Sequence, residues 1–200
     1  MKIQINEKSY KLKPASELTV KEYIKLFSLI NEKSGQIQIL MAYICSISGI
    51  NYSEAQKINI DENTIRRAFA YIGQINTPDN IPKVDYFYIK TTGKRIWKST
   101  LNWRSLGVRK LLEDRTYDNS LDLAIYLLAI YCDGNYDNEN IQEIYNDLQD
   151  YRANDVFGFV VFFLQKLSNG KKSEPNYFKK LLTKASINTA KLLNKLQAIA

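Results

Sequence analysis

Three almost uninterrupted apolar runs constrain the fold of this 200-residue chain most strongly, at residues 37–45, 121–132 and 156–164. A glycine follows shortly after each run, which is typical of the end of a helix. Helices that are apolar all round pack inside a protein core. Each run is well short of the roughly 20 residues that a helix needs to cross a bilayer. The runs therefore predict buried helices in a soluble protein with no membrane partner.

Amphipathic segments that carry capping residues predict further helices. Thr19 stands three residues before Glu22, which is a capping box, and apolar residues follow at helical spacing as far as Ile30. Ser53 and Gln56 repeat the capping-box pattern and predict a short helical turn. Further helix starts are expected at Asp61, at Ser105, at Ser120 and at Asn154 or Asp155, and an acidic helix is expected over residues 138–151.

Period-two alternation of apolar and polar residues predicts two short β-hairpins. The first joins residues 3–5 to residues 10–12, and the second joins residues 84–89 to residues 95–100 across a turn at residues 91–93. Together with the helical segments, they predict a mainly α fold with two short β-hairpins, which is an α+β arrangement.

The chain is organised as one helical domain with a basic extension. Residues 76–82 contain two prolines and predict a loop, which is the place for any internal seam. Residues 1–170 are expected to form a single mainly helical domain. Residues 171–200 are expected to form a basic amphipathic helical tail.

The absence of histidine excludes many functions. Histidine is the usual general base at neutral pH and the commonest metal ligand, and this chain has none. Cys45 and Cys132 lie in apolar runs and are expected to be buried, reduced thiols. Asp147 and Asp150 could share a helix face, but a solvated surface is the commoner fate of such a pair. We therefore expect no enzyme, with no catalytic, metal-binding or cofactor-binding residues.

Charge is sorted into blocks along the chain. The net charge is +2 over residues 1–81, +6 over residues 82–117, −8 over residues 118–155 and +7 over residues 156–200. Such blocks are typical of surfaces that face a partner. The basic amphipathic segment 166–195 can dock on the chain's own acidic block or on an external partner, and both options are open.

The second hairpin combines aromatic and basic side chains, which suit either of two partners. Aromatic rings can stack on bases while lysine and arginine neutralise phosphates, and the same side chains can contact a protein. Alternation places Tyr86 and Tyr88 on one face and residues 87 and 89 on the other, so at least one face belongs to the core. The residues expected to contact a partner are Tyr86, Tyr88, Arg95 and Trp97 in the hairpin, and Phe178, Lys179, Lys180 and Lys184 in the tail.

Several short motifs resemble small proteins of tailed-bacteriophage structural modules. They are LTVKEYI at residues 18–24, ISGI at residues 47–50, the Ser53-Glu54-Ala55 turn, the apolar segment 121–131, and a phenylalanine-rich segment at residues 155–167. The chain departs from that family in carrying a single acidic residue after Ser53 and in its basic tail after Lys171. The resemblance implies a tail assembly chaperone or a virion-associated protein, and it carries over no catalytic residue.

We therefore predict a non-enzymatic bacteriophage structural or assembly protein that acts through protein–protein contacts. It would be either a virion component of the neck or tail region or a tail assembly chaperone. Its expected partners are other phage structural proteins and copies of itself, in the host cytoplasm during assembly and, for a virion component, in the finished particle. The alternative is a nucleic-acid-binding accessory protein that uses the hairpin at residues 84–100 and the basic tail.

Overall fold

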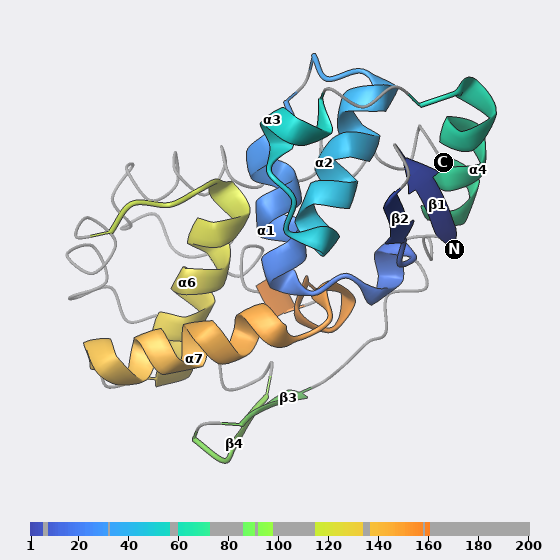
Figure 1. Cartoon of the computed structure of the whole chain (residues 1–200). Coiled ribbons are helices and arrows are strands. Elements are labelled where there is room, and N and C mark those ends of the chain that lie inside the picture. The colour runs from blue at the N-terminus through green and yellow to red at the C-terminus, as the bar shows by residue number, and fades with distance from the viewer. Residues whose placement is uncertain are drawn as a thin grey trace, which may run out of the picture.

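The computed structural model is mainly helical with two small antiparallel sheets, as predicted (Figure 1). It describes residues 1–5, 8–31, 33–56, 60–72, 86–90, 92–97, 115–133, 137–157 and 159–160. The strands are β1 (Lys2–Ile5), β2 (Lys8–Lys11), β3 (Tyr86–Ile89) and β4 (Lys94–Trp97). The helices are η1 (Ala15–Glu17), α1 (Val20–Leu29), α2 (Gln36–Ser48), α3 (Tyr52–Ala55), α4 (Glu62–Ile72), α6 (Ser120–Asp133) and α7 (Asn138–Asp150).

Three of the predicted segments lie outside the described residues. They are the loop at residues 76–82, the helix expected to start at Ser105, and the basic tail at residues 171–200.

The N-terminal hairpin forms where the alternation predicts it. Ile3 of β1 pairs with Tyr10 of β2 in antiparallel register, and the side chains of Ile3 and Leu12 are buried in the core. The backbone N–H of Leu12 donates to the Met1 carbonyl oxygen at 2.7 Å, which extends the pairing by one residue. The hairpin is therefore anchored in the core, which fixes the position of the chain where η1 and α1 begin.

Helix α1 begins at the predicted capping box. The Thr19 hydroxyl accepts the backbone N–H of Glu22 at 3.3 Å, and the Glu22 carboxylate accepts the backbone N–H of Thr19 at 2.9 Å. The ammonium of Lys13 also donates to the Glu22 carboxylate. The helix ends earlier than the apolar spacing predicts: Ile30 is extended, although its side chain is still buried.

Replacing Thr19 with alanine is expected to lower the free energy of unfolding by about 0.5–2 kcal/mol, because it removes the acceptor for the Glu22 N–H. Urea denaturation followed by circular dichroism measures the change. The control is Ser28→Ala on the exposed side of α1, where the hydroxyl bonds only within its own helix, to the Lys25 carbonyl. This control is expected to stay within about 0.5 kcal/mol of the wild type. Equal losses in the two variants would contradict a capping role for Thr19.

Helix α2 is the most deeply buried of the N-terminal helices, as its apolar run predicts. Every residue from Ile39 to Ser46 is buried. The helix ends at Gly49, which has φ +74° and donates its N–H to the Cys45 carbonyl at 3.2 Å. From the middle of the helix, Tyr43 donates its hydroxyl to the Lys13 carbonyl at 2.8 Å. This bond ties α2 to the segment between β2 and η1.

Two shorter helices pack against α2. The predicted helical turn at residues 53–56 exists as α3, but its predicted cap is wrong. Asn51 caps the helix, because its side-chain oxygen accepts both the backbone N–H and the hydroxyl of Ser53. Helix α4 begins after Asp61 as predicted, where the carboxylate accepts the Thr64 N–H at 2.9 Å. Hydrogen bonds from Thr64 lower the pKa of Asp61.

Helix α6 packs against α7, and both also contact α1 (Figure 1). Ser120 is the first residue of α6, as predicted, and Asn119 caps the helix by accepting the N–H groups of Leu121 and Asp122. The Asn119 amide also donates to the Ile24 carbonyl of α1 at 2.7 Å. Helix α7 buries the four residues that its spacing predicts, Ile141, Ile144, Tyr145 and Leu148.

The helix after α7 starts earlier than its sequence predicts. Residues 153–157 and 159–160 are helical, so Asn154 and Asp155 lie inside the helix and neither of them caps it. The reason is a tertiary contact, in which the Ala153 N–H donates to the Leu18 carbonyl at 2.9 Å. The Val20 N–H likewise donates to the Tyr151 carbonyl at 2.9 Å. Two chain segments far apart in sequence are therefore joined at the start of α1.

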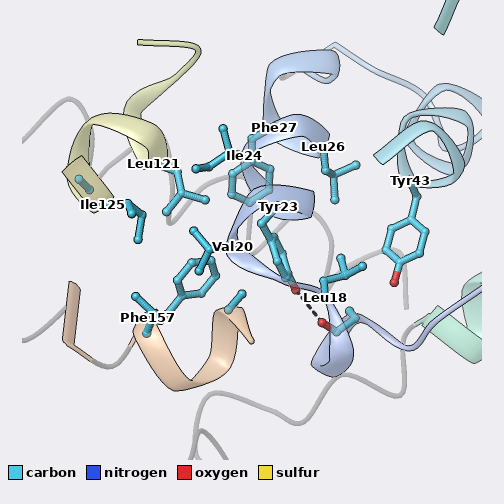
Figure 2. Close-up of a cluster of buried hydrophobic side chains, with 14 of the residues drawn as sticks. Leu18, Val20, Tyr23, Ile24, Leu26, Phe27, Tyr43, Leu121, Ile125 and Phe157 are labelled. Carbon is cyan, nitrogen blue, oxygen red and sulfur yellow. Dashed lines mark hydrogen bonds between the residues drawn. The ribbon is translucent and has the colours of Figure 1, made fainter. Parts of the chain in front are cut away.

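The core lies where α1, α2, α6 and the helical residues after α7 meet (Figure 2). Leu121 and Ile125 of α6 face α1, and Phe157 packs edge-on against Tyr23 at 5.3 Å between ring centroids. Tyr23 donates its hydroxyl to the Ala15 carbonyl, and burial raises the pKa of Tyr23 to about 12. In the part of the chain that the structure describes, no helix is long and apolar enough to span a bilayer.

Candidate functional site

The second hairpin lies beside helix α7, at the edge of the helical core (Figure 1). Tyr86 pairs with Trp97 and Tyr88 pairs with Arg95 in antiparallel register. At the turn, Gly93 has φ +66° and donates its N–H to the Ile89 carbonyl at 2.9 Å. A glycine is favoured there because other residues rarely adopt a positive φ. The alternation therefore predicted a hairpin that exists, with strands at residues 86–89 and 94–97, and the other predicted strand residues, 84–85 and 98–100, lie outside the described part.

One face of the hairpin belongs to the core, as the alternation predicts. Ile89 is only 1% exposed, and Ile96 of the opposite strand is also buried. Strand β3 contacts α7, and the ammonium of Lys90 lies 5.7 Å from the ring centroid of Tyr151, just after that helix. These contacts hold the hairpin against the helical core through its inner face.

The opposite face of the hairpin is exposed and aromatic. Tyr86 is 38% exposed and Tyr88 is 47% exposed, although both are large side chains. The guanidinium of Arg95 lies over the ring of Tyr86, 5.2 Å from its centroid, within the range of a cation–π contact. We call Tyr86, Tyr88 and Arg95 the outer hairpin face. The three described side chains form one continuous patch because Tyr88 and Arg95 are cross-strand partners.

The structure describes the side chains of three of the eight residues that were predicted to contact a partner. Tyr86, Tyr88 and Arg95 come together on the outer hairpin face. For Trp97, the backbone pairs with Tyr86, and its side chain lies outside the described part. The four predicted contacts in the tail lie outside the described residues, and these are Phe178, Lys179, Lys180 and Lys184.

The helix α7, which the hairpin contacts, is acidic. Residues 86–97 carry three basic residues and no acidic one, whereas neighbouring α7 carries four acidic residues and no basic one. Asp147 and Asp150 lie on this helix, the former half-buried and the latter exposed. Burial raises the pKa of nearby Tyr151, and the charge of Asp147 raises it further. The hairpin and helix together carry slightly more negative than positive charge.

A second cluster surrounds Arg115, where the chain enters α6. Its guanidinium lies over three tyrosine rings, with centroids 4.1 Å away for Tyr145, 4.4 Å for Tyr126 and 5.7 Å for Tyr117. It also forms an ion pair with Asp122 at 3.8 Å. We call these five residues the Arg115 cluster. Sequence reasoning missed it because its members come from three segments that only the tertiary fold brings together.

The residues around Arg115 also contact one another. The Tyr145 hydroxyl donates to the Asp122 carboxylate, whose other oxygen accepts the Asp118 N–H at 3.0 Å. Burial raises the pKa of Tyr145, and the hydrogen bond to Asp122 raises it further. The ring of Tyr126 packs against those of Tyr117 and Tyr145 at 5.8 Å and 5.5 Å between centroids.

The two cysteine thiols are buried. Cys45 and Cys132 are free thiols in the core, as predicted, and burial raises the pKa of both. Within the described ranges, no group of three or more histidine, cysteine, aspartate or glutamate side chains is placed to hold a metal ion.

Comparison of the chain with family models, with curated proteins and with solved structures finds no match.

Proposed function

We propose that this chain is a non-enzymatic bacteriophage structural or assembly protein that binds another protein through its outer hairpin face. The observation that carries the proposal is the exposure of Tyr86 and Tyr88 beside Arg95, on a hairpin whose other face is anchored in the core. The phage assignment rests only on the sequence motifs at residues 18–24, 47–55, 121–131 and 155–167.

The chemistry of the outer hairpin face suits a protein partner. Tyrosine and arginine are enriched where proteins bind one another, and tyrosine supplies a large contact area at a low cost in side-chain entropy. The anchored inner face holds Tyr86 and Tyr88 in place before a partner arrives, which reduces the ordering cost of binding. This arrangement supports a preformed docking surface.

The acidic helix beside the hairpin supports a protein partner over a nucleic acid, whereas the segment 82–117 as a whole carries a net charge of +6. Nucleic-acid binding depends on neutralising phosphates, and its strength grows with the number of basic contacts. Here the acidic residues of α7 outnumber the basic residues of the adjacent hairpin. A phosphate backbone that followed the hairpin would meet this acidic helix. A protein that presents apolar and mixed-charge side chains would not be repelled in this way.

The test is a pairwise binding measurement against the proteins encoded by neighbouring genes, each co-expressed with this chain. The variant replaces both Tyr86 and Tyr88 with serine, and we expect it to weaken binding to one of these proteins at least about tenfold. The matched control is Ile37→Ser, which removes an exposed apolar side chain from α2 and is expected to leave binding unchanged.

The opposing outcome is binding to DNA. If the chain binds single-stranded or duplex DNA in a salt-sensitive way, and Arg95→Ala abolishes that binding, the hairpin is a nucleic-acid site and the proposal is wrong.

If a protein partner is found instead, mass spectrometry of purified particles separates the two phage roles. A virion component is present in finished particles, whereas an assembly chaperone is absent from them.

A further inference from the structure

The side chains around Arg115 combine aromatic rings with hydrogen-bond acceptors, which is the chemistry that binds a guanidinium group. Aromatic rings lie close to its guanidinium, with the centroids of Tyr145 and Tyr126 at 4.1 and 4.4 Å. These two centroids are 5.5 Å apart, so the two rings meet the guanidinium from neighbouring directions. Its edges meet oxygen acceptors: Nη1 donates to the Gln142 side-chain oxygen at 3.1 Å, and Nη2 lies 3.8 Å from Asp122 Oδ1. Aromatic rings combined with acceptors for several N–H groups suit a flat guanidinium, whose five donors are fixed in one plane, better than a round ammonium.

The walls of this site do not need Arg115 to hold their positions. Asp122 is fixed by hydrogen bonds from the Tyr145 hydroxyl and the Asp118 N–H. Tyr126 and Tyr145 are almost fully buried and pack against each other at the interface of α6 and α7. Arg115 itself enters from the coil before α6, and a quarter of its side chain is exposed. Arg115 is therefore more accessible than Asp122, Tyr126 and Tyr145.

We propose that Tyr117, Asp122, Tyr126, Gln142 and Tyr145 form a guanidinium-binding site, which Arg115 fills from within the chain as a latch. The latch ties the segment before α6 onto the α6–α7 pair. The ligand class is a guanidinium group. In the wild-type protein the tethered Arg115 is present at a high effective concentration and excludes free ligand. Removing its side chain opens the site to a guanidinium compound in solution.

The experiment compares Arg115→Ala with the wild type in thermal unfolding, with methylguanidinium as the probe and methylammonium as the control ligand. The variant is expected to melt about 3–8 °C below the wild type. Methylguanidinium should raise its melting temperature in a saturable way with a millimolar dissociation constant, because so small a ligand has few contacts. The melting temperature of the wild type should not rise at the same concentrations of methylguanidinium. Methylammonium should not raise the melting temperature of Arg115→Ala.

Two further variants keep the test decisive. Arg115→Lys retains the charge but not the flat shape, and we expect it to melt well below the wild type and to fold if the alanine variant does not. Arg66→Ala removes an exposed arginine that is paired with Glu62 on α4, and it should melt as the wild type does. The proposal fails if Arg115→Lys matches the wild type, if methylammonium rescues as well as methylguanidinium, or if methylguanidinium leaves Arg115→Ala unchanged.

Discussion

Replacing Ile125 with alanine is expected to lower the free energy of unfolding by about 2–5 kcal/mol, which is a large share of the stability of a domain this size. Ile125 is 0% exposed and lies on α6 where that helix faces α1 (Figure 2). The substitution removes buried methyl and methylene groups and leaves a cavity between two helices. The cavity is costly because both helices are held by other contacts and cannot close over it.

The matched control for this change is Ile37→Ala on α2. Ile37 is also a helical isoleucine, but it is 52% exposed, so the same substitution should cost less than about 0.5 kcal/mol. Chemical denaturation at equilibrium measures both variants, and an unchanged slope with denaturant would show that the unfolding reaction is the same. A loss for Ile125→Ala no larger than that for Ile37→Ala would mean that α6 does not pack on α1 as described.

Replacing Asp122 with alanine is expected to lower the free energy of unfolding by about 3–5 kcal/mol, because it leaves the buried Tyr145 hydroxyl and the partly buried Arg115 guanidinium without their carboxylate. Asp122 is almost fully buried and accepts hydrogen bonds from the Tyr145 hydroxyl and the Asp118 N–H. It also pairs with Arg115. After the substitution, the Tyr145 hydroxyl and the Arg115 guanidinium would each stay in the same low-polarity surroundings with no carboxylate.

A double-mutant cycle with Tyr145→Phe tests whether Asp122 acts through this hydrogen bond. We expect the two substitutions together to cost clearly less than their sum, because Tyr145→Phe removes one of the donors that Asp122→Ala would strand. The control is Asp150→Ala at the exposed end of α7, expected to change stability by less than about 0.5 kcal/mol. Full additivity of the Asp122 and Tyr145 changes would contradict the hydrogen bond.

Local sequence patterns predicted most of the described helices and both hairpins. The capping box at Thr19, the glycine end of α2 at Gly49 and the buried stripe of α7 are interactions within a few residues, so the sequence carries their full cause. The alternation in the second hairpin likewise predicted two unlike faces. Which face points outward depends on contacts with α7, and the structure places Tyr86 and Tyr88 outside.

The two wrong helix caps have different origins, one in a local choice between two capping residues and the other in a hydrogen bond between distant segments. Ser53 looked like a cap because of its spacing to Gln56, but Asn51 two residues earlier has the oxygen that accepts from it. Asn154 and Asp155 looked like caps for the last helix. That helix starts earlier because Ala153 bonds to the carbonyl of Leu18, more than a hundred residues away along the chain.

The sequence by itself determined the mainly helical class, the two hairpins and the burial of residues 39–45 and 121–130, because these depend on periodicity and on bonds between near neighbours. Only the tertiary structure decided which hairpin face is exposed and that Arg115 meets three tyrosines and Asp122. The physical reason is that Arg115 and the buried Asp122 find their partners in space and not along the chain. Asp122 and Tyr126 lie on α6, Tyr145 lies on α7 and Tyr117 precedes α6, so the cluster exists only after the two helices have packed.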